Sequence, residues 1–366
     1  MSLSIGIAGA GSIALATAAL LESRGHRAVL WSPSGAGTQG LEGGITASGA
    51  LDGQYRPAIA QTPKDLAATD VLLVAVPGYG HKAVFDALAP VICEGQHVII
   101  SSHASFGALY LHGKLAERGV SAPITCWGTT AVTGRRQDGA AVLVNTIRAR
   151  IDMCTVPADQ QDAALDQCED LFGPVFAPRD GLLAITLSNL NPQNHMGIAL
   201  GNMTRMERGE NWSQGQNVTP KVGRLLERLD EERLAIANAL ELSVKTIFEH
   251  FHQSFHVPVA SISDMNQQMH AQGNGGTGPA TADSRYVTED VPYGLLPVVV
   301  LGRLAGKPAV LHQAGIDIFS AMYGRDFATE NQLLSALDLT AFSLDDLTMA
   351  AHTGILPDAT QTTPSA

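Results

Sequence analysis

Short apolar runs alternate with segments of helical periodicity through the first half of the chain. Each run is bounded by Gly, Pro or Ser, and the intervening segments repeat apolar residues at helical spacing, as at 15–24 and 81–88. This alternation is typical of buried parallel strands joined by helices. We therefore expect a doubly wound α/β sheet domain over residues 1–180, with strands at 5–8, 27–31, 70–77, 96–101 and 123–127.

From Gly181 onward the pattern predicts long helices and few strands. Apolar residues recur at helical spacing over 182–209, 222–252, 291–304 and 310–323, and a wide apolar face in the second of these favours packing on other helices. A polar, glycine-rich stretch at 272–279 predicts a loop near the active site. The second half, residues 181–366, is expected to be an all-α domain.

The first strand ends in a glycine-rich turn that leads directly into a helix. Gly9 permits the tight turn, Gly11 lets a pyrophosphate approach the backbone, and the amides from Ser12 and Ile13 onward open the helix. Ala10 lies between the two glycines. This pattern predicts a nicotinamide or flavin dinucleotide site. Ligands of such sheets lie beyond the carboxyl ends of the strands, so we expect Trp31 and Pro77 to line the site as well.

The segment after the second strand bears on which cofactor is bound. Enzymes that select NAD usually carry an acidic residue there for the ribose 2′-hydroxyl, whereas this chain has no acid before Glu42. Ser32, Ser34 and Thr38 could donate hydrogen bonds to a 2′-phosphate. The sequence therefore favours NADP. Because this loop contains no arginine, a pocket that accepts either cofactor also fits.

Composition and charge exclude several kinds of partner. The 366 residues suffice for two domains, and the net charge of −12 argues against nucleic acid or an anionic membrane. No stretch is long enough to span a membrane, and no leader precedes the first motif, so a cytoplasmic location is expected. The four cysteines have no CxxC spacing, which predicts free thiols, most of them buried. His252 and His256 are four apart but lack a carboxylate motif, so no metal is expected.

Four segments of the chain resemble the opine dehydrogenases of the octopine and nopaline type. They are Val76-Pro-Gly-Tyr-Gly-His81, Asn191-Pro-Gln-Asn-His195, Leu229-Asp-Glu-Glu-Arg233-Leu-Ala-Ile-Ala and Ser284-Arg285-Tyr286-Val-Thr-Glu-Asp290-Val-Pro292. The resemblance covers nearly the whole length. It implies a Rossmann-like domain followed by a helical substrate domain. It also implies condensation of an amino acid with a 2-oxo acid such as pyruvate, with reduction of the imine by NADH or NADPH.

The same resemblance implies the site residues. It places a catalytic histidine on His195, its acidic partner on Asp290 and a residue that binds a substrate carboxylate on Arg285. Asn191 lies four residues before His195, one turn away if the segment is helical, and could orient substrate or water. Histidine suits the chemistry because it titrates near neutral pH, where a carbinolamine must lose water and an imine must gain a proton.

Two departures from the family concern the substrate. Met196 follows the histidine where many relatives have proline, and its neighbourhood of Met203, Met206 and Trp212 predicts an apolar pocket that favours a hydrophobic amine or a large amino acid. Asn331 replaces a basic residue often found in the family. Two other functions fit the same residues, namely a ketone or cyclic imine reductase and a non-catalytic dinucleotide sensor. The apolar helices of the second half also predict a homodimer.

Overall fold

The computed structural model describes residues 2–339 and 342–357, and the chain forms two units. The first unit contains the chain up to Ile185 and the described residues from Ala336 onward, and the second is Thr186–Ser335. The boundaries fall within helices α6 (Gly181–Ser188) and α14 (Gln332–Leu337). We expected a division at residue 180, whereas in these units the described residues from Ala336 onward lie with the first.

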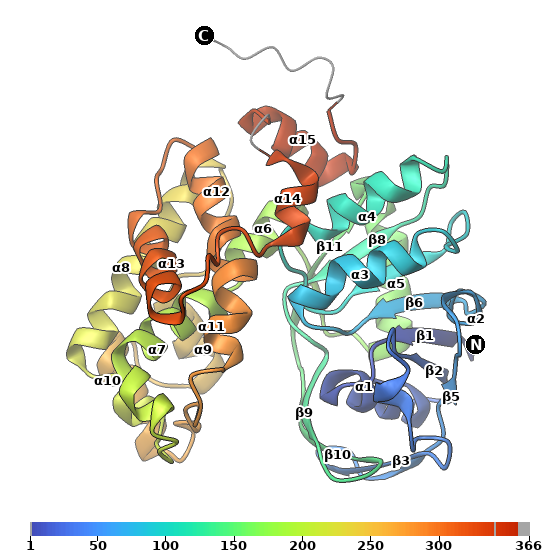
Figure 1. Cartoon of the computed structure of the whole chain (residues 1–366), viewed down its shortest axis with the longest axis horizontal. Helices are drawn as coiled ribbons and strands as arrows, with labels where there is room; N and C mark the ends of the chain where they lie inside the picture. Colours follow the sequence, from blue (N-terminus) through green and yellow to red (C-terminus); the bar gives the residue numbers. More distant parts are fainter. Residues whose placement is uncertain (1, 340–341, 358–366) are drawn as a thin grey trace. The chain divides into compact units, whose positions relative to one another are not determined.

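An eight-stranded sheet forms the centre of the first unit (Figure 1). Its strand order is β12-β11-β8-β7-β6-β1-β2-β5, and within this sheet β11 pairs with β8 antiparallel while the other described neighbours pair in parallel. The apolar runs of the sequence form its middle, where Ile7 of β1 lies beside Leu30 of β2 and Leu73 of β6. The expected Rossmann-like sheet is thus confirmed. The strands are β1 (Ser4–Ala8), β2 (Arg27–Trp31), β5 (Ala58–Ile59), β6 (Val71–Val74), β7 (His97–Ile100), β8 (Ile124–Trp127), β11 (Ile151–Val156) and β12 (Phe176–Pro178).

A second sheet of four strands, absent from the expectation, lies on the other side of helix α1 (Ser12–Ser23). Ala14 to Leu21 of α1 are all buried, as expected for a helix that is apolar all round. Val132 and Val142 of the second sheet join Ile5 and Ile7 of the first in one core. The second sheet contains β3 (Ile45–Gly49), β4 (Gly53–Tyr55), β9 (Val132–Arg136) and β10 (Ala141–Ile147).

The remaining helices of the first unit are short. They are η1 (Ala36–Thr38), α2 (Pro63–Ala67), α3 (Gly78–Leu88), α4 (Gly107–Ala116), η2 (Ala158–Gln160), α5 (Gln161–Phe172) and α15 (Leu344–Thr353). Helix α15 packs near β11, and Gly354 at its end lies so close to the His112 ring that a Cβ there would be 2.6 Å from it. These contacts explain why α15 joins the first unit.

The second unit is helical, as expected, but two of the expected long helices are broken. The tract 182–209 forms α6 and α7, because Pro192 starts a new helix after Leu190. The tract 222–252 is interrupted after Ala239, close to Glu241 in the left-handed conformation (φ 56°). The helices are α7 (Asn191–Glu207), η3 (Gly215–Asn217), α8 (Pro220–Ala239), α9 (Ile247–Phe255), α10 (Ile262–Ala271), α11 (Arg285–Thr288), the π-helical η4 (Val291–Leu295), α12 (Leu296–Leu304) and α13 (Val310–Tyr323).

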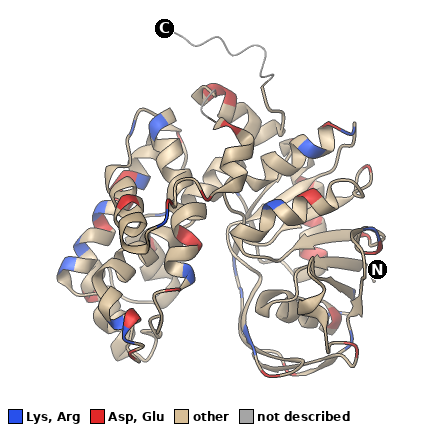
Figure 2. Cartoon of the chain, in the orientation of Figure 1, with Lys and Arg blue, Asp and Glu red and all other residues tan. Residues whose placement is uncertain are grey.

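Bulk features of the described residues follow the sequence. Lys and Arg are interspersed with Asp and Glu over both units (Figure 2). All four cysteines are free, with Cys93 exposed and the other three buried, which confirms the expectation of free thiols. Among residues 2–339 and 342–357, no helix is both long and apolar enough to cross a membrane.

Candidate active site

The glycine-rich turn has the backbone that a pyrophosphate requires. Gly9 has φ 140°, its amide donates to the Trp31 carbonyl oxygen at 2.8 Å, and a Cβ at this position would collide with the Ala75 carbonyl. Only glycine therefore fits. Gly11 precedes α1, and a Cβ there would meet no described atom within 4 Å. The start of α1 has no side-chain cap from the described residues, so its amides remain available to a phosphate.

The other expected cofactor residues surround this turn to different extents. Ser12 and Ile13 are half-buried in the first turn of α1, and Pro77 precedes α3 at the carboxyl end of β6. Ala10 and Trp31 are buried, so Trp31 lies in the core as the last residue of β2. A dinucleotide fits the open helix start better than the buried indole.

Three hydroxyls in the loop after β2 were expected to donate hydrogen bonds to a 2′-phosphate, and two of them are placed to do so. Ser32 and Ser34 lie with their Oγ atoms 3.4 Å apart, and Ser34 is exposed. Thr38 is buried, and its hydroxyl donates to the Gly35 carbonyl oxygen at 3.0 Å. In this arrangement the Thr38 hydroxyl is engaged by the backbone of its own loop, unlike that of Ser34.

In the second unit, His195 and Asp290 form a hydrogen-bonded pair. Nδ1 of His195, in α7, lies 2.6 Å from Oδ2 of Asp290, which joins α11 to η4. The two side chains are 21% and 20% exposed, so both are accessible from solvent. With Nδ1 engaged by the carboxylate, Nε2 is the ring nitrogen left to exchange a proton with a substrate.

Close packing of two backbones brings this pair together. A Cβ at Gly294 of η4 would lie 2.6 Å from Cβ of Pro192, in the first turn of α7. Asn331, which is fully buried, donates from Nδ2 to the Pro292 carbonyl oxygen at 2.8 Å. Asn331 therefore helps to hold the π-helical turn after Asp290, which accounts for an amide at this position instead of a basic side chain.

Tyr286 completes the surroundings of His195, and the sequence did not single it out. Its ring is stacked on the imidazole, with centroids 3.6 Å apart and planes 9° apart. Its hydroxyl donates to Oε1 of Gln214 at 2.5 Å. Burial, and then the charge of Asp290, raises the pKa of Tyr286 to about 12, so the phenol stays protonated. Tyr286 precedes Asp290 by four residues, a helical spacing that could have revealed it.

The expected substrate-binding residues lie in different environments. Asn191 is exposed in the first turn of α7, one helical turn before His195. Arg285 has a side chain that is 71% exposed and forms an ion pair with Glu289 at the next turn of its helix.

Trp212 belongs instead to the core of the second unit. It is buried with Met203 and Met206, and its indole N–H donates to the Pro279 carbonyl oxygen at 3.0 Å. The apolar pocket expected from these three residues is therefore filled by their own packing. We do not include Trp212 in the site proposed below.

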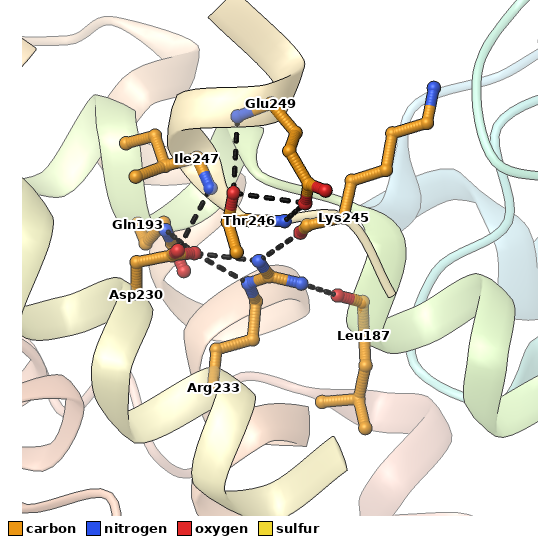
Figure 3. A network of polar contacts seen from close by, with 8 residues as sticks. All are labelled: Leu187, Gln193, Asp230, Arg233, Lys245, Thr246, Ile247 and Glu249. Carbon is orange, nitrogen blue, oxygen red and sulfur yellow. Dashed lines mark hydrogen bonds and ion pairs between the residues drawn. The ribbon is translucent and has the colours of Figure 1, made fainter. Parts of the chain in front are cut away.

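A buried ion pair anchors the start of α7 (Figure 3). Oδ1 of Asp230 accepts from Nη2 of Arg233 at 2.6 Å and from Nε2 of Gln193 at 3.0 Å, and its Oδ2 accepts from the Ile247 amide at 2.8 Å. The side chains of Arg233 and Asp230 are only 1% and 2% exposed. Because Gln193 is two residues before His195, this network holds the helical turn that carries the catalytic candidate.

Comparisons with known proteins agree with this arrangement. Residues 178–323 match a family described as NAD/NADP octopine/nopaline dehydrogenase, alpha-helical domain, and residues 5–142 match ketopantoate reductase PanE/ApbA. An opine dehydrogenase from Arthrobacter sp. (strain 1C) is 31% identical over 350 residues, which are 92% of this chain and 95% of that protein.

Solved structures show the same fold at lower identity. An octopine dehydrogenase with NADH and pyruvate is 18% identical, covers 98% of this chain and 99% of its own, and has a TM-score of 0.78. A yersinopine dehydrogenase with NADP⁺ is 15% identical, with coverages of 96% and 98% and a TM-score of 0.68. Together with the 31% identity over nearly the whole length, these likenesses establish the relationship. The chain belongs to the opine dehydrogenase family, whose members are NAD- or NADP-dependent oxidoreductases that act on CH–NH donors.

Proposed function

We propose that this protein joins an amino acid or another amine to a 2-oxo acid by reducing the imine that the two form. The observation that carries the proposal is the pair of His195 and Asp290, at 2.6 Å, with Tyr286 stacked on the imidazole. Asn191 and Arg285 complete the proposed site as groups that orient the substrates. Arg285 suits a carboxylate because a guanidinium can donate two parallel hydrogen bonds.

The proposed residues act on protons at defined atoms. The amine nitrogen adds to the carbonyl carbon of the 2-oxo acid, and the resulting carbinolamine must lose its hydroxyl as water. His195 donates the proton on Nε2 to that hydroxyl, which leaves as water while the C=N bond forms with a positive charge on nitrogen. Asp290 keeps the proton on Nδ1 and stabilises the charged ring. NAD(P)H, when bound, would supply the hydride that adds to the carbon of this iminium group and gives a secondary amine.

The protein surrounds this chemistry with groups of fixed protonation. Tyr286 remains neutral because burial and the Asp290 charge raise its pKa to about 12. A neutral ring stacked on the imidazole restricts its rotation and covers one face from water. His195 can thus return to the same orientation in each turnover.

NADPH is the proposed cofactor, in preference to NADH. The support is the loop after β2, where no carboxylate precedes Glu42 and where Ser32 and Ser34 offer hydroxyls. A carboxylate there would repel a 2′-phosphate.

One screen tests the reaction. The absorbance of NADPH and of NADH is followed with pyruvate, 2-oxoglutarate or cyclohexanone, each with and without a panel of amino acids and simple amines. Consumption that requires both a carbonyl compound and an amine supports the proposal. Consumption with a ketone alone would instead support a ketone reductase. Tight cofactor binding without turnover of any pair would support a dinucleotide sensor.

We also propose that the protein is a homodimer. Helix α13 exposes Val310, Ile318 and Met322, and apolar side chains on one helix can form a subunit contact. Sedimentation equilibrium should give twice the chain mass, and Ile318→Asp with Met322→Asp should give the mass of one chain. A monomer in the unsubstituted protein would contradict this.

A cytoplasmic location is proposed from the state of the cysteines. The four thiols are free, and a reducing compartment keeps them so while also supplying reduced nicotinamide cofactors. Cell fractionation with an antibody against the protein tests the location directly.

A further inference from the structure

Arg136, the last residue of β9, connects three parts of the cofactor site. Its Nη1 donates to the carbonyl oxygens of Ala10 and Gly37, each at 2.9 Å. Its backbone amide donates to Oγ of Ser12 at 2.8 Å. A residue of the second sheet therefore links the glycine-rich turn, the start of α1 and the loop after β2.

The loop after β2 packs directly on the glycine-rich turn at this place. A Cβ at Gly37 would lie 2.9 Å from Cβ of Ala10 and 3.0 Å from Oγ of Ser32. Only a residue without a side chain allows this approach without displacing either neighbour. Ser32 and the Arg136 guanidinium are consequently grouped around the same two backbone segments, Ala10 and Gly37.

This position is where a dinucleotide fold binds the adenosine ribose. The ribose lies between the glycine-rich turn and the end of the second strand, and the residue found there decides between a 2′-hydroxyl and a 2′-phosphate. We infer that Arg136 binds the 2′-phosphate of NADP and sets the preference of this enzyme for NADP over NAD. The inference rests on the proposed NADPH preference and names the residue responsible for it.

The chemistry of the guanidinium fits this role. Nη1 is occupied by two carbonyl oxygens, which fix the plane of the group, whereas Nε and Nη2 have no hydrogen-bond partner among the described residues. Arg136 is half-buried, so these donors are held in a partly desolvated place. A guanidinium held in this way binds phosphate through charge-assisted hydrogen bonds.

Direct binding to the free protein tests the inference without any turnover. Titration calorimetry compares adenosine 2′,5′-bisphosphate with adenosine 5′-monophosphate, which differ only in the 2′-phosphate. We expect the bisphosphate to bind tighter. Arg136→Gln should weaken its binding about 10- to 100-fold while changing monophosphate binding by less than about threefold. Glutamine keeps a neutral donor for the backbone carbonyls, so the substitution removes mainly the charge.

Arg135 provides a matched control. It is the exposed neighbour of Arg136 on β9, and Arg135→Gln makes the same change of net charge. It should leave both affinities within about threefold. Arg136→Lys should retain part of the preference because it keeps a positive charge.

Three results would overturn the inference. They are equal affinity of the unsubstituted protein for both nucleotides, equal losses for both in Arg136→Gln, and an equal effect of Arg135→Gln on the bisphosphate. None of them depends on imine reduction, so the inference can fail while the proposed reaction holds. In steady-state kinetics, Arg136→Gln should lower kcat/KM for NADPH by a larger factor than kcat/KM for NADH.

Discussion

The bond between His195 Nδ1 and Asp290 Oδ2 makes a direct prediction for catalysis. His195→Ala and Asp290→Asn should each lower kcat about 10²- to 10⁴-fold, because a positioned acid–base group contributes about that much. The affinity for NADPH, measured by fluorescence titration, should stay the same because the dinucleotide turn lies in the first unit. A kcat within about tenfold of the original for both variants would remove the pair from the mechanism.

Tyr286 allows the stacking on His195 to be separated from the hydroxyl contact with Gln214. Tyr286→Phe keeps the ring, so its kcat should remain within about twofold of the original. Tyr286→Ala removes the stacked ring and should lower kcat about 2- to 10-fold, the worth of one aromatic contact. Initial rates at saturating substrate measure both. Equal losses in the two variants would assign the effect to the hydroxyl.

Three buried histidines of the first unit predict how stability depends on pH. Burial lowers the pKa of His81 and of His97 to about 4, and burial followed by the charge of His81 lowers that of His103 to about 3. The unfolded chain takes up these protons near pH 6.5, whereas the folded chain does not. The free energy of unfolding therefore has its full value above pH 6.5, where the three histidines are neutral in both states. It decreases as the pH drops from 6.5 toward 4.

Urea denaturation at pH 7.5 and pH 5 measures this loss. His103→Leu removes one of the three groups, and its stability should fall less between the two pH values than that of the unsubstituted protein. A loss of the same size in both proteins would show that His103 takes up its proton equally well in the folded state.

At the scale of elements, the network of Figure 3 should dominate the stability of the second unit. Asp230→Asn leaves Arg233 buried with an uncompensated charge, which should cost about 3–5 kcal/mol of unfolding free energy. Arg228 offers a control on the same helix, since it pairs with Glu231 at the surface. Arg228→Gln should cost about 0–1 kcal/mol in the same urea titration. A cost below about 1 kcal/mol for Asp230→Asn would contradict the anchoring role.

The sequence revealed the elements whose pattern is local. Strands β1, β2 and β6 to β8 are continuous apolar runs, which buried parallel strands require. The second sheet could not be recognised because its strands alternate irregularly between buried and half-exposed residues, as in β9. The helical periodicity of the sequence continues from α6 into α7 and from α8 into α9. The breaks between these helices occur at Pro192 and near Glu241, whose backbone is left-handed.

In the candidate site, too, residues that are brought together only by the fold could not be predicted from local sequence patterns. His195 and Asp290 were predicted, although 95 residues separate them, because the family resemblance links their motifs. Trp212 was expected to line a pocket because a group of one aromatic residue and several methionines is found both in protein cores and in apolar binding sites. In the structure this group belongs to the core of the second unit. Arg136 lies 126 residues from Ala10 along the chain, and only the folded second sheet brings the two together.

At the scale of the whole molecule, helix α15 should stabilise the first unit and not the second. Leu347 and Ala350 of α15 are fully buried in that unit, and Met349 is exposed. Unfolding of the first unit is identified as the thermal transition whose Tm rises when NADPH is added. Leu347→Ala should lower the Tm of this transition by about 5–10 °C, whereas Met349→Ala should change that Tm by less than about 1 °C. Scanning calorimetry with and without NADPH identifies that transition. An effect confined to the other transition would place α15 with the second unit.

The return of the chain from Ser335 to the first unit also has a consequence for biosynthesis. A ribosome delivers the nucleotide-binding sheet first, then the whole helical unit, and only afterwards the helix that covers β11. Domains that are contiguous in sequence can finish folding as they emerge. Here the first unit is completed only after the whole helical unit has been made, so during that interval the nascent chain exposes to chaperones and proteases the surface that α15 later covers.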